Sequence, residues 1–247
     1  MAHSVLRAAW PASSHLFRTC ASATIALAIG ALGIAQAATD DATVDALFNW
    51  AEYRYPNELG SSSGSLVAGG FRYRFYAQTG VYLGYRSDDD KLYLLPQGAS
   101  QPIPLGAIAP FLRDAQTPPS DATELAAYLQ RSLYRNWPAE SAAHPSAGPH
   151  FGNVRTWINP VLQASLIAGD AEHPVQAAAV KEMYGAGSST PQGWSVMVRN
   201  RKGNGGEGWY WYEIYNNRSF AASQGASLCT GCHSAGKDFV RISVPLK

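Results

Sequence analysis

The chain has 247 residues, enough for two domains of ordinary size, and carries 19 basic and 18 acidic residues for a net charge of +1. So balanced a charge argues against nucleic acid or an anionic membrane as the main partner. Three cysteines are too few for a disulfide framework, so their spacing needs another explanation.

The first 37 residues predict an export signal. Arg7 and Arg18 supply positive charge, and 21–34 form an apolar run too short for a comfortable membrane span. Residues 35–37 read Ala-Gln-Ala, the small-x-small pattern of a signal-peptidase site, so we expect cleavage before Ala38 and a periplasmic or secreted product. Loss of two arginines leaves 17 basic against 18 acidic residues, and no later run is long enough to span a bilayer.

Residues 41–114 predict a small α+β module. Apolar residues at helical spacing indicate a short helix that ends before Pro56. Alternating aromatic and basic residues at 71–75 indicate a strand, and turn residues separate it from further strands at 81–85 and 91–95. We therefore expect a helix and a three-stranded meander with its aromatic side chains in the core.

Two stretches of this module, LFNWAEYRYP at 47–56 and FRYRFYAQTGVYLGY at 71–85, resemble a short exported bacterial domain of unknown role. The resemblance implies nothing about chemistry. A proline-containing linker at 115–120 is stiff and extended, and it predicts the domain boundary.

Residues 121–247 predict a second domain, a mostly antiparallel β-sheet with flanking helices. A capping box at Asp121 and Glu124 begins a helix over 122–135, and Asn159 caps a second helix over 161–168. Four strands are predicted, at 154–158, 177–184, 194–199 and 209–215. The whole chain is therefore assigned to the α+β class.

The stretch Cys229-Thr230-Gly231-Cys232-His233 has the pattern C-x-x-C-H. Two thiols at this spacing can add across the two vinyl groups of a haem, and the adjacent imidazole then lies beneath the iron. Cleavage of the export signal removes Cys20, so both remaining cysteines belong to this motif. The motif predicts one covalently attached haem c, with Cys229 and Cys232 as attachment residues and His233 as the iron ligand.

Two other chemistries use a C-x-x-C pair. A thioredoxin-like redox dithiol belongs at the start of a helix within a βαβ pattern, which this region lacks. A structural zinc site needs four Cys or His ligands in two pairs, and the sequence has no second pair. Both interpretations are therefore weaker than haem attachment.

Five stretches of the second domain carry a further signal. They are HFGNVRTWINP at 150–160, AAAVKEMY at 177–184, GWSVMVRN at 193–200, GWYWYE at 208–213 and CTGCHSAGKDFV at 229–240. Their order resembles the cytochrome P-460 and cytochrome c′-beta family, β-sheet haem proteins with a C-terminal C-x-x-C-H. The resemblance covers the C-terminal domain, and it implies a five-coordinate iron whose far side is open to small nitrogen ligands.

The resemblance also implies roles for charged residues. In cytochrome P-460 a strand lysine is bonded to the haem edge and the protein oxidises hydroxylamine, and Lys181 in VKE matches that lysine. Members called cytochrome c′-beta lack the cross-link and look like gas-binding or electron-transfer proteins. Arg155 and Glu207 are candidates for the open side, where Arg155 would hold an oxyanion and Glu207 would accept protons. Simple exposure to solvent stays an alternative for Lys181 and Glu207.

A sixth protein ligand would close the far side of the haem. Met183 and Met197 lie on predicted strands, and His150 and His173 could also reach the iron. Strand methionines more often fill gaps in a core, so we expect the far side to be open.

The sequence therefore predicts an exported monohaem c-type cytochrome that binds or oxidises a small nitrogen species such as hydroxylamine or nitric oxide. One alternative is a six-coordinate electron-transfer cytochrome without catalysis. Another is a haem-based sensor or binding module whose first domain contacts a partner protein. Expected partners are the nitrogen ligand, a redox protein and, as an open alternative, a second copy in a homodimer. Enzymatic activity depends on whether Lys181 is cross-linked.

Overall fold

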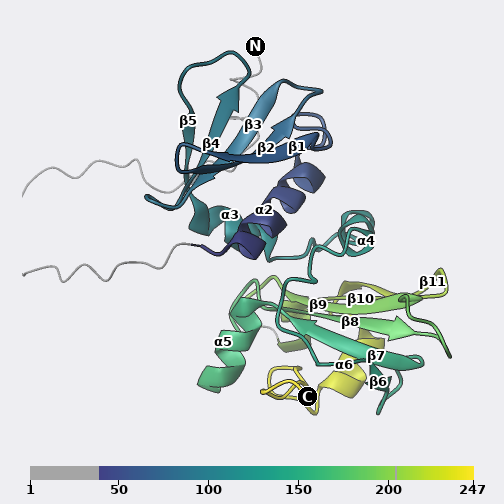
Figure 1. Cartoon of the computed structure of the whole chain (residues 1–247). Helices are drawn as coiled ribbons and strands as arrows, with labels where there is room; N and C mark the ends of the chain where they lie inside the picture. The colour runs from purple at the N-terminus through teal and green to yellow at the C-terminus, as the bar shows by residue number, and fades with distance from the viewer. Residues whose placement is uncertain (1–38, 204) are drawn as a thin grey trace, which may run out of the picture. The chain divides into compact units, whose positions relative to one another are not determined.

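The computed structural model describes residues 39–203 and 205–247, so the predicted export signal and Cys20 lie outside the described residues. The chain divides into two compact units, 1–111 and 112–247. The division falls inside α3 (Ile108–Ala115), just before the predicted linker. Each unit combines helices with one antiparallel sheet, which confirms the α+β class (Figure 1). In the described part of the chain, no helix has both the length and the apolar character needed to cross a membrane.

The first unit is a five-stranded antiparallel meander with helix α2 (Asp41–Arg54). Its strands pair in chain order: β1 (Gly64–Ala68), β2 (Phe71–Tyr76), β3 (Val81–Arg86), β4 (Lys91–Pro96) and β5 (Ile103–Ala107). The expected three-stranded meander was therefore incomplete. Strands β1 and β5 were missed. Strand β1 is exposed at all of its residues and β5 has no buried residue, so neither shows the apolar alternation on which the prediction depended.

Charged residues of β2 join the first sheet to its helix. Arg72 Nη2 lies 2.7 Å from Asp45 Oδ2, and Arg74 Nη1 lies 3.1 Å from Glu52 Oε1. Since alternate side chains of a strand point to opposite faces, Phe71 falls on the other face, where it stacks on a neighbouring tyrosine. The sequence alternation in β2 therefore separates an ion-paired face from an aromatic one.

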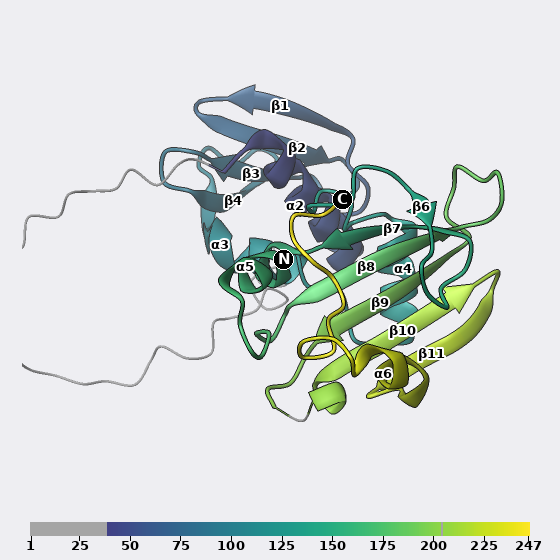
Figure 2. The same ribbon diagram turned by 90° about the horizontal axis from the view of Figure 1, so that it is seen from below.

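The second unit is a six-stranded antiparallel sheet in the order β11-β10-β9-β8-β7-β6. Its strands are β6 (His144–Pro145), β7 (Asn153–Ile158), β8 (Ala178–Tyr184), β9 (Gly193–Arg199), β10 (Trp209–Tyr215) and β11 (Arg218–Gln224). Helix α4 (Ala122–Gln130) covers one face, and α5 (Pro160–Ala168) and α6 (Ser227–His233) lie on the other (Figures 1 and 2). A 3₁₀ turn, η1 (Gly205–Gly208), precedes β10.

The ends of the helices follow from local chemistry. Asn159 caps α5 by accepting from the N–H of Leu162, and Gly169 ends it in the left-handed region at φ +70°. Helix α4 stops at Gln130 and not at the predicted 135, because Ser132 takes φ +55°. The four predicted strands of this unit are all present, but β6, β11 and α6 were not predicted.

Neighbouring residues of β8 serve opposite faces of the sheet. Glu182 is fully buried on the α4 side, where Arg135 Nη2 lies 2.7 Å from its Oε1 and the hydroxyls of Tyr134 and Tyr184 donate to its carboxylate. Lys181 faces the other side, toward α6. Because three side chains donate to this one buried carboxylate, the position of Glu182 in the fold is tightly constrained.

We expect Glu182→Ala to lower the free energy of unfolding by about 3–5 kcal/mol, because it leaves a guanidinium and two hydroxyls unpaired against the sheet. Chemical denaturation followed by tryptophan fluorescence measures the change. The exposed Glu207→Ala is the matched control and should change stability by no more than about 0.5 kcal/mol. Equal losses in the two variants would contradict the assignment.

Candidate functional site

A cavity of about 430 Å³ lies on the α6 side of the second sheet. One row of residues paired across four strands forms part of its wall: Thr156, Lys181, Ser195 and Glu213. The next row belongs to the buried apolar core: Ile158, Ala179, Met197 and Trp211. The strand register therefore places a polar row beside an apolar one on the same face.

Helix α6 brings the C-x-x-C-H residues to this cavity. Cys229, Cys232 and His233 all line it, since residues three and four apart share one side of a helix. These three side chains therefore point into the cavity from α6, and the polar row of the sheet lines the same cavity.

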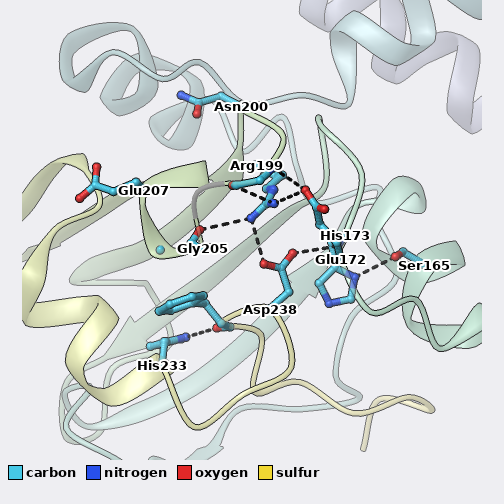
Figure 3. A network of polar contacts seen from close by, with 12 residues as sticks. Ser165, Glu172, His173, Arg199, Asn200, Gly205, Glu207, His233 and Asp238 are labelled. Atoms are coloured by element: carbon cyan, nitrogen blue, oxygen red, sulfur yellow. Dashed lines mark hydrogen bonds and ion pairs between the residues drawn. The ribbon is translucent and has the colours of Figure 1, made fainter.

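His233 has a fixed tautomer. Its Nδ1 lies 2.8 Å from the carbonyl oxygen of Phe239, so Nδ1 carries the proton and Nε2 keeps its lone pair (Figure 3). The Trp211 ring packs edge-on at 4.8 Å between centroids. Burial lowers the pKa of His233, although the Phe239 carbonyl opposes that shift. A neutral imidazole with a free Nε2 is the form that can bind a metal.

Both cysteines of the motif are free thiols. Burial, with a smaller contribution from Glu213, raises the pKa of Cys229 to about 11. A catalytic redox dithiol depends on a lowered thiol pKa, which stabilises the thiolate. The environment of Cys229 therefore argues against a thioredoxin-like role.

Lys181 extends into the cavity from the middle of β8. Burial lowers the pKa of its amine, and Glu140 and Glu213 partly oppose this effect. Among the described residues its amine has no hydrogen bond or ion pair. This differs from Glu182, the next residue, whose carboxylate is fully engaged on the other face.

A hydrogen bond joins His150 and Glu213 in the wall of the same cavity. His150 Nδ1 lies 3.0 Å from Glu213 Oε2, and the two side chains are only 14% and 11% exposed. Burial acts to raise the pKa of Glu213, but the hydrogen bond from His150 and the nearby Lys181 hold it below its usual value. Glu213 is therefore an ionised carboxylate inside the cavity at neutral pH.

The rings of His150 and His233 approach each other. Their centroids are 6.3 Å apart with an interplanar angle of 69°. In both residues Nδ1 is engaged by an oxygen, so both have Nε2 available.

Two residues predicted for the open side do not line the cavity. Val154 and Thr156 line the cavity, and Arg155 lies between them on the strand, so the Arg155 side chain points to the opposite face of the sheet. There its guanidinium lies 4.8 Å from the centre of the Trp157 ring. Glu207 lies in η1 and points away from His233 (Figure 3). The structure therefore brings Lys181 together with the C-x-x-C-H residues, but not Arg155 or Glu207.

Of the other residues considered as sixth ligands, Met183 and His173 are separated from the cavity. Met183 is fully buried and does not line the cavity. His173 is 2% exposed, with Nδ1 2.8 Å from Ser165 Oγ, away from the cavity. Met197 shares a smaller cavity of about 50 Å³ with His150 and His233.

The sequence indicated His150 only as a sixth ligand and did not indicate Glu213. Glu213 follows four consecutive aromatic residues in GWYWYE. A carboxylate that directly follows such an apolar run was the one sequence feature that could have indicated its role. Its pairing with His150, 63 residues away, depends on the sheet register and could not be inferred locally.

Comparison with known proteins adds no further assignment. The chain matches no protein-family model and no curated protein. Within 39–203 and 205–247, no group of three or more His, Cys, Asp or Glu side chains could hold a metal ion by itself. The candidate site thus consists of the C-x-x-C-H residues, Lys181, and the pair formed by His150 and Glu213.

Proposed function

We propose that residues 112–247 form an exported monohaem c-type cytochrome domain whose cavity binds or oxidises a small nitrogen species such as hydroxylamine or nitric oxide. One observation carries the proposal: Cys229, Cys232 and His233 line the same cavity as Lys181 and Glu213. A haem-attachment motif therefore faces a cavity that is lined by charged and hydroxyl-bearing side chains.

The residues present fit a covalently held haem in three respects. The two thiols are free and share a helix face. His233 is held through Nδ1 by a backbone carbonyl, the usual outer contact of a metal-binding imidazole. The cavity walls also include apolar rings, among them Phe151, Trp211 and Phe220, which suit a porphyrin face.

A bound haem iron supplies one-electron chemistry and a coordination position for a small ligand. The remaining steps fall to the chain itself. Glu213, ionised and held by His150, can accept a proton from an N–H or O–H group. The Lys181 amine, which makes no hydrogen bond or ion pair among the described residues, can donate to the oxygen of the ligand. Electrons from an oxidised substrate would pass to a redox partner protein.

A six-coordinate electron carrier is the second candidate, because one observation favours it. The rings of His150 and His233 lie 6.3 Å apart between centroids in the same cavity, so these two imidazoles could both hold one haem iron. The carboxylate of Glu213 on Nδ1 of His150 would complete the usual outer contact of such a ligand.

Covalent attachment is tested with Cys229→Ala combined with Cys232→Ala. We expect the double variant to lose all haem staining on a denaturing gel, because no thioether can form. The wild type and the cavity-wall variant Ser195→Ala should both stain. Staining that persists in the double variant would refute the proposal.

The coordination state is tested by the absorption spectrum of the ferrous protein. We expect high-spin iron that binds nitric oxide, because the proposal leaves the far side of the haem without a protein ligand. The His150→Ala spectrum should then stay high-spin, as should that of His144→Ala, a matched control whose side chain is 47% exposed at the cavity wall. A low-spin wild type that His150→Ala converts to high-spin would establish the electron carrier instead.

Oxidation of hydroxylamine, as opposed to binding alone, is tested at Lys181. We expect tryptic digestion to give haem joined to a peptide that contains Lys181 as well as to CTGCH, and hydroxylamine to reduce the ferric protein with turnover. Lys181→Arg keeps a cation but should lose the third link and the turnover. An unmodified Lys181 in fully haem-loaded protein would leave only ligand binding or electron transfer.

A further inference from the structure

The carbonyl that holds His233 belongs to a turn with an unfavourable backbone. Asp238 and Phe239 have φ of +45° and +66°, and Val240 N donates to Lys237 O at 2.9 Å across the turn. Two successive positive φ values define a type I′ turn, which glycine and asparagine normally occupy. For a bulky residue such as Phe239 this conformation is an outlier, and it persists only where the surroundings enforce it.

A buried ion pair enforces it. Arg199 Nη1 lies 3.0 Å from Asp238 Oδ1, and the two side chains are 1% and 7% exposed (Figure 3). The other oxygen of Asp238 accepts from the backbone N–H of His173 at 2.8 Å. Both carboxylate oxygens are therefore fixed, one by β9 and one by the segment before β8.

The guanidinium is itself held in one place. It lies over the Trp209 ring, 5.4 Å from its centroid. A Cβ at Gly208 would lie 2.6 Å from Arg199 Nη1, so glycine is needed there for the side chain to pass. On the solvent side Arg199 Nη2 contacts Glu172 at 2.7 Å, but Glu172 is 52% exposed. The buried partner of Arg199 is Asp238.

We infer that Arg199 and Asp238 are positioning residues for the haem ligand: they hold the Phe239 carbonyl against His233 Nδ1 and thereby set the electron-donating strength of that imidazole. The inference rests on the proposed haem attachment. The ion pair of Arg199 with Asp238 holds the strained turn in place, and the turn presents the Phe239 carbonyl. In the described chain, His233 is the only residue whose side chain donates a hydrogen bond to this carbonyl. An acceptor on Nδ1 makes an imidazole a stronger donor, which stabilises ferric iron and lowers the reduction potential.

The test uses the full haem-loaded protein and two measurements. The midpoint potential should rise in Asp238→Ala, because a released turn weakens the bond from His233 Nδ1 to the carbonyl. In the ferrous protein the hyperfine-shifted Nδ1–H resonance of His233 should move, and this proton should exchange with solvent faster. Asp238→Asn keeps an oxygen for Arg199 but loses the charge, so it should shift both measurements in the same direction by less.

Two further variants separate positioning from general stability. Glu172→Gln removes the solvent-side partner of the same guanidinium and should leave the potential and the Nδ1–H signal unchanged. Arg199→Lys keeps a cation for Asp238 and should lie closer to the wild type than Arg199→Met. If Asp238→Ala does not accumulate as haem-loaded protein, Asp238→Asn carries the test.

The outcomes distinguish this inference from the proposal on which it rests. Full haem staining with equal potentials and equal Nδ1–H signals in the wild type and Asp238→Asn would overturn the positioning role and leave haem attachment intact. A shift in Glu172→Gln as large as that in Asp238→Asn would also overturn it, because the effect would then follow the charge of Arg199. Wild-type protein without covalent haem would overturn both.

Discussion

The register of the second sheet is the constraint on which the site depends. Pairing of β7 with β8 and of β8 with β9 aligns Thr156, Lys181 and Ser195, and β10 adds Glu213 to the same row. A slip of β8 by one residue would turn Lys181 to the α4 face and bring the buried Glu182 toward α6. The burial of Glu182 among three donors resists such a slip, so a stabilising contact on one face fixes the chemistry of the other.

The residues on the two sides of the cavity are positioned by different interactions. On the sheet side, charged groups are positioned by strand pairing and by one another, as Glu213 is by His150. On the helix side, α6 is a short helix without a side-chain cap, and the turn that follows it accepts the hydrogen bond from His233. That turn is anchored to β9 by Arg199, two residues along the strand from Met197 in the core. The sheet thus holds both the cavity wall and the residue that faces it.

Much of the second unit could be predicted from local patterns, because its signals are local. Apolar alternation identified β7 to β10, and the Asn-Pro pair located the start of α5. The polar strand β11 has no such alternation, since most of its residues are exposed. Two of the expected residues lie outside the cavity for a related reason. Arg155 and Glu207 were selected as charged residues that the family resemblance implies near the ligand, but only strand parity and register decide which charges meet.

Lys181 and Glu182 are neighbouring charged residues that differ in their hydrogen-bond partners, and this difference separates a structural role from a chemical one. Glu182 gives up solvent and recovers three hydrogen bonds, so its burial contributes to the fold. The Lys181 amine is partly buried with a lowered pKa and without a partner in the described chain, so its burial opposes folding. A fold retains an unfavourable group of this kind more readily where the group has a use. A cavity that also holds two thiols and an imidazole with a free nitrogen offers one.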